Sequence, residues 1–191
     1  TPGGKGANQA VAAARLGAGV HMAGCVGDDD FGRRLLAALR EEGVGHDGVR
    51  VTADAPTGLA MISVDHAGEN IITVAPGANH EVGPAEVRAA LTEPQNVLVV
   101  CAEIPLEVIV AALARHRASI LNLAPVPEPP ADEAAIVAAA RPDWLVVNET
   151  EAGAVLGRPV RGLAEAGEAA AALLTTGARH AVVTAGAHGA A

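Results

Sequence analysis

The sequence predicts an α/β fold with a mostly parallel sheet and a small separate hairpin. Beyond Asn96, short apolar runs that are typical of strands alternate with helical segments, which is the pattern of a βα array. These runs are continuously apolar, as in strands that are buried on both faces. Two further extended segments, residues 58–64 and 70–74, lie between helix-rich regions. We expect them to form a lid hairpin at about residues 57–75, although an edge hairpin of the main sheet would give the same pattern.

Length and composition indicate the class of protein. The chain has 191 residues, of which 50% are hydrophobic and 18% charged. These values are typical of a globular domain, so we expect residues 1–191 to form one domain. Only 1% are aromatic and none is tyrosine, so the core has to consist of Ala, Val, Leu and Ile. The same shortage and the net charge of −9 argue against nucleic acid as a partner, which selects basic faces and aromatic platforms.

Membrane association is not expected either. No apolar run reaches the roughly 18 residues that span a bilayer, and no charged, then apolar, then small-residue leader opens the chain. We therefore expect a cytoplasmic protein. Cys25 and Cys101 lie inside apolar strand-like runs, where a buried thiol is the default. The seven histidines show no spacing typical of a zinc site.

The first elements follow from glycines, acids and apolar spacing. A helix is expected from about Asn8 to residue 16, ended by Gly17 just past its C-terminus. A buried strand at residues 21–26 follows. Three acids at residues 28–30 then precede a helix at residues 31–42. We interpret these acids as helix caps and solvated charges, because three adjacent acids in a turn cannot all face one metal ion.

The remaining elements complete the array. The lid hairpin is expected to end in a turn at residues 76–79, after which Pro84 begins a helix at its first position. The expected strands are residues 97–101, 120–123, 144–147 and 181–184, and the expected helices are residues 106–116, 132–140, 149–156 and 163–175.

The glycine-rich opening of the chain is the first candidate site. Glycines at positions 3, 4 and 6 let the backbone approach a ligand, and the helix that follows offers N–H groups and the positive end of its dipole. Lys5 and Asn8 add a cation and an amide. This mixture suits a polyhydroxylated ligand that becomes anionic. A glycine-rich turn that only starts a helix would give the same residues.

Polar residues just past the predicted parallel strands form a second candidate site, because ligands collect at the carboxyl ends of such strands. Glu103 follows one strand, Asn122 lies near the end of another, and a second glycine loop begins at Thr184. Asn148 and Glu151 share one face of a helix start and could orient a hydrated Mg²⁺ beside phosphates. They could equally be the two members of a capping box.

Several motifs occur in one order along the chain. They are Gly-Gly-Lys-Gly-Ala-Asn-Gln from Gly3, Gly-Cys-Val-Gly-Asp-Asp-Asp-Phe-Gly from Gly24, Gly-Glu-Asn from Gly68, Gly-Ala-Asn from Gly77, Asn-Glu-Thr-Glu from Asn148 and Thr-Ala-Gly-Ala-His-Gly from Thr184. Together they resemble the motifs of the ribokinase (PfkB-type) sugar kinases. The first string favours ribokinases over the adenosine, fructose and phosphofructose kinases of that family.

The resemblance implies a ribokinase-like three-layer sandwich with a small β lid, and ATP-dependent phosphorylation of a sugar primary hydroxyl, above all D-ribose to D-ribose 5-phosphate. It implies Mg²⁺ and ATP, K⁺ as a monovalent cation in the complete enzyme, and a homodimer through the lid. The implied sugar-binding residues are Gly4, Lys5, Gly6, Ala7, Asn8 and Glu103. The implied ATP-binding residues are Asn148, Thr184, Ala185, Gly186, Ala187, His188 and Gly189, with Glu151 organising the metal.

The family's opening strand and its Gly-Asp motif with the catalytic base would fall outside Thr1 to Ala191. We therefore expect an incomplete domain, no catalytic residue within it, and an inactive fragment. Another sugar or nucleoside kinase of the family and a non-catalytic sugar-binding relic are alternatives. A dinucleotide-dependent dehydrogenase is a third, because Asp28 follows the first glycines by roughly 20 residues, although Gln9 takes the place of the third glycine.

Overall fold

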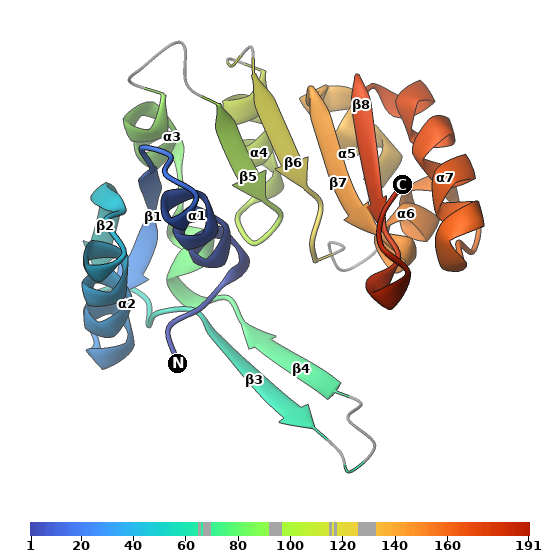
Figure 1. Cartoon of the computed structure of the whole chain (residues 1–191). Helices are drawn as coiled ribbons and strands as arrows, with labels where there is room; N and C mark the ends of the chain where they lie inside the picture. Colours follow the sequence, from blue (N-terminus) through green and yellow to red (C-terminus); the bar gives the residue numbers. More distant parts are fainter. Residues whose placement is uncertain (65, 67–69, 92–96, 115, 117, 126–132) are drawn as a thin grey trace. The chain divides into compact units, whose positions relative to one another are not determined.

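The computed structural model describes residues 1–191 except 65, 67–69, 92–96, 115, 117 and 126–132. The chain divides into two compact units, Thr1–Ala90 (unit 1) and Leu91–Ala191 (unit 2), which run from blue to green and from green to red in Figure 1. A single incomplete domain over residues 1–191 stays a prediction.

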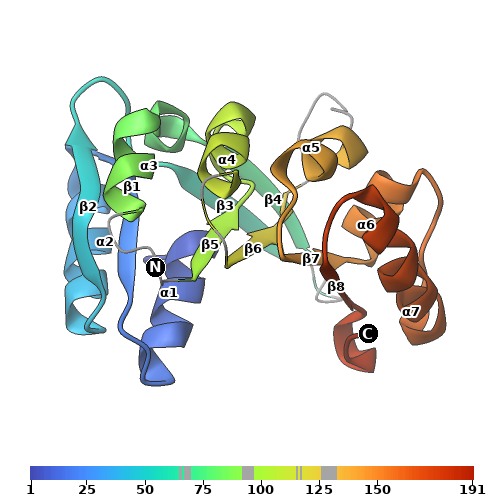
Figure 2. The ribbon, with the colours of Figure 1, turned by 90° about the horizontal axis from the view of Figure 1, so that it is seen from above.

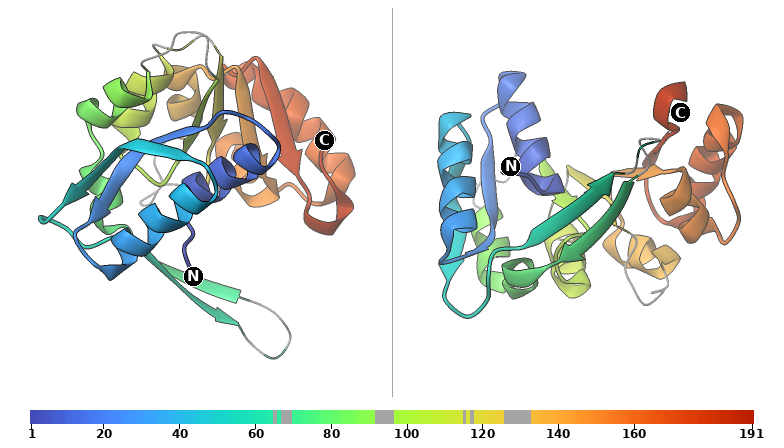
Figure 3. Two further views of the ribbon diagram at one scale, coloured as in Figure 1. Left: turned by 60° about the vertical axis from the view of Figure 1, so that its left-hand side comes forward. Right: turned by 90° about the horizontal axis from the view of Figure 1, so that it is seen from below.

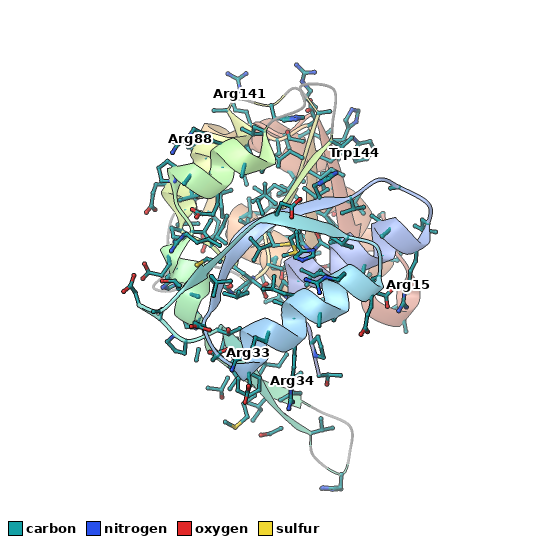
Figure 4. All side chains as sticks on the ribbon, turned by 90° about the vertical axis from the view of Figure 1, so that its left-hand side faces the viewer. Arg15, Arg33, Arg34, Arg88, Arg141 and Trp144 are labelled. Atoms are coloured by element: carbon teal, nitrogen blue, oxygen red, sulfur yellow. The ribbon has the colours of Figure 1, made fainter. Side chains whose placement is uncertain are left out.

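Unit 1 contains a two-stranded parallel sheet between helices. Strand β1 (His21–Gly27) pairs in parallel with β2 (Gly45–Thr52). Helices α1 (Lys5–Arg15) and α2 (Asp30–Glu41) pack around a small cluster that includes Met22 and Leu39. Helix α3 (Pro84–Ala90) lies on the other side of the sheet (Figure 4).

Helix α1 begins earlier than predicted. Gly4 is its N-cap with a φ of 96°, and the N–H of Asn8 donates to the Gly4 carbonyl at 3.0 Å. The residues from Lys5 to Asn8 are therefore the first helical turn and not a loop before it. The predicted end is confirmed, because Gly17 has a φ of 92° and the N–H groups of Gly17 and Ala18 donate to Ala14 and Ala13, the pattern of a Schellman cap.

Strand β2 was missing from the sequence prediction. Its residues include two glycines, a histidine, an aspartate and an arginine, so neither a continuous apolar run nor a clean alternation marks it. Pairing with β1 over His21↔Gly45 to Gly27↔Thr52 supplies the backbone hydrogen bonds that hold it. A long-range pairing therefore stabilises a strand for which the local sequence gives little signal.

The hairpin forms a sheet of its own. Strands β3 (Leu59–Val64) and β4 (Asn70–Ala75) pair antiparallel in the register Leu59↔Ala75 to Val64↔Asn70, so the edge-hairpin alternative is wrong. The ribbon projects from the rest of unit 1 (Figures 1 and 3). Its predicted turn includes residues 65 and 67–69, and with them part of the Gly-Glu-Asn motif, which lie outside the described residues. A short 3₁₀ helix, η1 (Gly77–Glu81), replaces the predicted turn after β4.

Unit 2 contains a four-stranded parallel sheet in the order β5-β6-β7-β8. The strands are β5 (Leu98–Cys101), β6 (Ser119–Asn122), β7 (Trp144–Asn148) and β8 (His180–Thr184), and the helices are α4 (Leu106–Leu113), α5 (Glu133–Ala140), α6 (Glu149–Leu156), α7 (Gly162–Leu173), η2 (Leu174–Thr176) and η3 (Gly186–His188). Helix α4 is shorter than predicted, α7 ends in a 3₁₀ turn, and Asp132 of the predicted fifth helix lies outside the described residues.

The aliphatic core of unit 2 confirms the prediction from composition. Leu121, Leu145 and Val183 are fully buried at the centre of a cluster of Ala, Val, Leu and Ile side chains. Helices α4 and α5 cover one side of the sheet (Figure 2). The prediction that the strands are buried on both faces of the sheet holds only in part, because Val99 in β5 and Trp144 in β7 are 47% and 43% exposed.

Two further expectations concern thiols and membranes. Cys25 and Cys101 are both buried and are not joined in a disulfide, and burial raises the pKa of the Cys25 thiol. Within the described residues, no helix combines the length and the apolar character that crossing a bilayer requires.

Candidate functional site

The first turn of α1 gathers the residues predicted from the opening loop. The N-cap residue Gly4 offers no side-chain cap, and the turn contains no acidic residue. The positive end of the helix dipole is therefore not neutralised by a carboxylate of its own turn. Lys5 is half-buried and Asn8 is exposed. This end of α1 suits hydroxyl groups and anions.

Gly4 and Gly6 are glycines for different structural reasons. Gly4 needs its positive φ, which costs a residue with a side chain extra energy. A Cβ atom added to Gly6 would lie 3.3 Å from Cε of Met22 in β1, so Gly6 leaves room for the end of the Met22 side chain. Since α1 runs into β1 through a short connection, the start of α1 lies at the carboxyl end of β1 (Figure 1).

In unit 2, the sheet register brings the other predicted residues to one edge. Asn148 and Thr184 are directly paired at the ends of β7 and β8, and Cys101 pairs with Asn122 at the ends of β5 and β6. Glu103 follows β5 immediately, after Ala102 has donated its N–H to the Asn122 carbonyl at 3.1 Å. The carboxyl ends of all four strands therefore carry polar side chains, as predicted for a ligand-binding edge.

Asn148 and Glu151 form the capping box that the sequence allowed. The N–H of Asn148 donates to Glu151 Oε2 at 2.8 Å, and the N–H of Glu151 donates to Asn148 Oδ1 at 2.9 Å. Glu151 is buried at 7% exposure. The structural role is thus present, and a metal role for Glu151 would have to coexist with it.

The second glycine loop folds into a tight turn after β8. Ala185 and Gly189 are joined by a hydrogen bond of 2.8 Å from N–H to carbonyl, and Ala190 bridges back to Thr184. Gly186 and Gly189 have φ values of 53° and 99°. A Cβ atom on either glycine would meet nothing within 4 Å. These glycines serve backbone conformation, and the surface beside them stays open to a ligand.

The predicted site residues therefore fall into two groups. The first group lies in unit 1 and consists of Gly4, Lys5, Gly6, Ala7 and Asn8. The second group lies at one sheet edge in unit 2 and consists of Glu103, Asn148, Glu151 and the loop from Thr184 to Gly189. Among the described residues, no three His, Cys, Asp or Glu side chains are placed to hold a metal ion. A metal at the unit 2 edge would need ligands from water or from a bound nucleotide.

The sequence did not point to the base of the hairpin. Asp29, predicted as a cap, does cap α2 by accepting from the Gly32 N–H at 2.8 Å. Its carboxylate also accepts from the N–H and the hydroxyl of Thr57, at 2.8 and 2.7 Å. The hydrogen bonds from Gly32 and Thr57 lower the pKa of Asp29 to about 2. A glycine inside the first turn of a predicted helix, as at Gly32, is the sequence signal that could have marked this close approach.

Comparison with known protein families tests the resemblance seen in the motifs. Residues 1–191 match the pfkB family carbohydrate kinases. The chain belongs to the pfkB carbohydrate kinase family. The resemblance seen in the motifs is confirmed, and this match favours the kinase class over the dehydrogenase alternative.

Individual members of the pfkB family agree with this assignment. A ribokinase from Schizosaccharomyces pombe is 41% identical over 201 residues, which cover 98% of this chain and 62% of that protein. A mouse ribokinase is 33% identical over 98% of this chain and 58% of its own length. The chain thus spans about three fifths of the length of these curated relatives.

Solved structures of pfkB kinases share the fold. Arabidopsis thaliana ribokinase, complexed with ribose and ATP, superposes with a TM-score of 0.82 at 25% identity and covers 98% of this chain and 62% of its own. Ribokinase from Thermotoga maritima gives 0.79 at 30% identity, over 100% and 62%. The ribokinase-like α/β fold predicted from the sequence is therefore confirmed.

Proposed function

We propose that the full-length protein containing this chain transfers a phosphoryl group from ATP to the primary hydroxyl of a sugar, converting D-ribose to D-ribose 5-phosphate. The observation that carries this proposal is the first turn of α1, where an uncapped helix start carries Lys5 and Asn8. Relatives named ribokinase, which align with 98% of the chain, support ribose as the sugar.

The sugar is assigned to the residues from Gly4 to Asn8 and to Glu103. Backbone N–H groups at the start of α1 and the side chains of Lys5 and Asn8 can donate to sugar hydroxyls, and Asn8 can also accept. The Glu103 carboxylate accepts from hydroxyl groups. A site of this kind rejects sugars that lack the matching hydroxyl, because its own polar groups are then left without partners.

ATP is assigned to Asn148 and to the loop from Thr184 to Gly189. A positive-φ glycine loop presents backbone groups to phosphates without side-chain interference, and the ribokinase of Arabidopsis thaliana is a relative in fold that was solved with ATP. Glu151 fits a part in holding Mg²⁺ through water, because its buried carboxylate lies at the carboxyl end of β7 beside Asn148. Bound Mg²⁺ neutralises charge on the phosphates.

The β3–β4 hairpin is assigned as a lid that keeps water from the reacting phosphate, so that ATP is not hydrolysed before sugar binds. Its face with Leu59, Met61 and Ser63 carries hydroxyl groups among apolar side chains, whereas the face with Ile62 and Ile72 is apolar apart from Asn70 at its far end. The mixed face suits the sugar, and the apolar face suits a second copy of the chain in a homodimer. Activation by K⁺ and a cytoplasmic location stay predictions.

Other sugars are the second candidate. A deoxyribokinase from Salmonella typhimurium is 32% identical over 98% of the chain. The first experiment is therefore a coupled ADP-release assay of the full-length protein with ribose, 2-deoxyribose, fructose and adenosine. We expect the highest kcat/KM for ribose. Equal or higher efficiency with another acceptor would overturn the ribose assignment, and no acceptor-dependent ADP release would overturn the kinase assignment.

The second experiment tests the sugar site. We expect Lys5→Ala and Asn8→Ala each to raise the KM for sugar about tenfold, because each removes a hydrogen bond to one substrate only. The KM for ATP should stay within about twofold. Arg40→Ala, which removes an exposed cation at the far end of α2, is the control and should change neither value. Equal effects of Lys5→Ala on both substrates would contradict the sugar assignment.

A further inference from the structure

The base of the β3–β4 hairpin is held by one carboxylate that performs two tasks. Asp29 Oδ1 accepts from the Gly32 N–H at 2.8 Å and from the Thr57 hydroxyl at 2.7 Å, while Oδ2 accepts from the Thr57 N–H at 2.8 Å. Thr57 stands just before β3 begins at Leu59. The same side chain therefore caps α2 and holds the foot of the hairpin's first strand.

The Thr57 hydroxyl extends this contact to the end of β1. Its Oγ1 accepts from the Gly27 N–H at 2.9 Å while donating to Asp29. One threonine thus joins the carboxyl end of β1, the N-terminus of α2 and the start of the hairpin. A capping role for Asp29 alone would require none of these Thr57 bonds.

Glycines allow the backbones at this base to cross. A Cβ atom on Gly27 would lie 2.5 Å from the Thr57 nitrogen, and one on Gly32 would lie 2.3 Å from the Gly27 carbonyl oxygen. On the returning side, a Cβ atom on Gly77 would lie 2.3 Å from the Pro56 carbonyl oxygen. The N–H of Ala78 donates to the same Pro56 oxygen at 2.8 Å. The first foot of the hairpin is therefore held by β1 and α2 through Thr57, and the returning foot is held against the first.

Beyond this base, the strand β3 is exposed to solvent along its whole length. Every residue of β3 is exposed, including Met61 and Ile62 at 64% and 58%. An isolated two-stranded hairpin is only marginally stable in water. The direction in which β3 and β4 project is therefore set by the base, where the hydrogen bonds and close contacts are concentrated.

We propose that Asp29 is a positioning residue for sugar phosphorylation: through Thr57 it holds the lid hairpin in the orientation that receives the sugar. This proposal rests on the proposed kinase function and on the hairpin acting as its lid. Losing the contact leaves the helix and the chemistry in place but allows the hairpin to occupy other directions. The sugar then has to select the closed orientation from a wider set, which raises its apparent KM.

Asp29→Asn separates the two tasks of the carboxylate. Asparagine caps helices about as well as aspartate, so its carbonyl oxygen can keep the Gly32 bond. The NH₂ group of the asparagine then takes the place of Oδ2, where it cannot accept the hydrogen bond from the Thr57 N–H. Thr57→Val removes the hydroxyl at nearly constant shape, and Thr57→Ser restores it. Asp30→Asn is the matched control, because Asp30 is an exposed neighbour whose described partner is Arg33 at 2.7 Å.

The test combines steady-state kinetics with hydrogen exchange on the full-length protein. We expect Asp29→Asn and Thr57→Val to raise the KM for sugar about fivefold to tenfold, with the KM for ATP and kcat within about twofold. ADP released without sugar should rise relative to sugar-dependent ADP. Amides of β3 and β4 should exchange at least about threefold faster, and those of α2 should not change. Asp30→Asn and Thr57→Ser should behave as the wild type.

The outcomes are distinguishable. Unchanged exchange in β3 and β4 for Thr57→Val would overturn the proposal, and so would an unchanged sugar KM in an active enzyme. Faster exchange in α2 of Asp29→Asn would show a damaged cap, and Thr57→Val, which leaves the cap intact, then decides. If the wild type phosphorylates no sugar, the kinase function fails by itself, and with it the role in phosphorylation, while the exchange data still decide whether Asp29 orients the hairpin.

Discussion

Glu151 is the residue at which a structural and a functional role meet. Its reciprocal hydrogen bonds with Asn148 complete a capping box, which short-range sequence rules were able to predict. Those rules could not decide whether the carboxylate also serves a metal, because both roles need an acid three residues after the cap. A change that keeps the hydrogen bonds and removes the charge separates them.

We predict that Glu151→Gln leaves the free energy of unfolding within about 1 kcal/mol of the wild type, since glutamine also completes capping boxes. The kcat at low Mg²⁺ should fall and should partly recover at high Mg²⁺, because weaker ion binding is overcome by mass action. The measurement is kcat against Mg²⁺ concentration for the full-length enzyme.

Glu165→Gln provides the control for this prediction. Glu165 accepts from the Arg161 N–H at 2.8 Å at the start of α7, so the substitution removes a charge from a similar position in another helix. Its Mg²⁺ dependence should match that of the wild type. Superimposable curves for Glu151→Gln and the wild type would mean that Glu151 is a cap alone.

The sequence predicted the role of single residues only where that role depends on neighbours in the chain. Asp29 was predicted as a cap from its place before α2, and that is confirmed. Its bonds to Thr57 join residues 28 positions apart, and no spacing rule covers such a distance. The part of the site that depends on chain crossing was therefore accessible only through the fold.

Among the elements, the buried parallel strands were the easiest to predict. Strands β5 to β8 are short apolar runs flanked by helices, and burial makes their sequences distinctive. Strand β2 escaped because its polar residues and glycines depend on pairing with β1. The start of α1 was misplaced for a related reason, since glycines in a first helical turn look like a loop.

Gly32 offers a test of packing at the element scale. Replacing an exposed helical glycine by alanine usually stabilises a helix by up to about 1 kcal/mol. At Gly32 the added Cβ atom would lie 2.3 Å from a backbone oxygen of Gly27. We therefore predict that Gly32→Ala lowers the free energy of unfolding by about 2–4 kcal/mol, measured by urea denaturation.

Gly24→Ala is the matched control for this substitution. Gly24 lies in the middle of β1, where an added Cβ atom meets nothing within 4 Å, so its replacement should cost less than about 1 kcal/mol. A Gly32→Ala protein as stable as Gly24→Ala would show that α2 can move away from the hairpin base at little cost.

For the whole molecule, the order of motifs identified the family, whereas composition gave only its class. The shortage of aromatic residues correctly indicated an aliphatic core. It did not indicate where apolar side chains stay on the surface. Those of the hairpin, such as Ile62, Ile71 and Val74, are more than half exposed, and apolar patches of this kind are typical of interfaces.

We predict that the full-length protein is a dimer whose contact includes the hairpin face with Ile62 and Ile72. Ile62 and Ile72 are directly paired on that face, and a charge placed between two copies would be buried without a partner. Ile62→Lys and Ile72→Lys should therefore sediment as monomers in analytical ultracentrifugation at concentrations where the wild type is dimeric.

Met61→Lys is the control on the opposite face of the same strand. It should leave the dimer intact and raise the KM for sugar, since its face is assigned to the substrate. A monomeric wild type would contradict the dimer, and loss of the dimer in Met61→Lys alone would reverse the assignment of the two faces.

The glycines at the hairpin base differ from the residues of β3 in how freely they can be substituted during evolution. A side chain at the crossing would strike backbone atoms, and no substitution in a neighbouring residue removes a backbone atom. The side chains of β3, in contrast, face outward, so replacing them disturbs little else. Related proteins can therefore acquire a new preference for substrate or partner through substitutions on the surface of the hairpin, while the glycines at its base are retained.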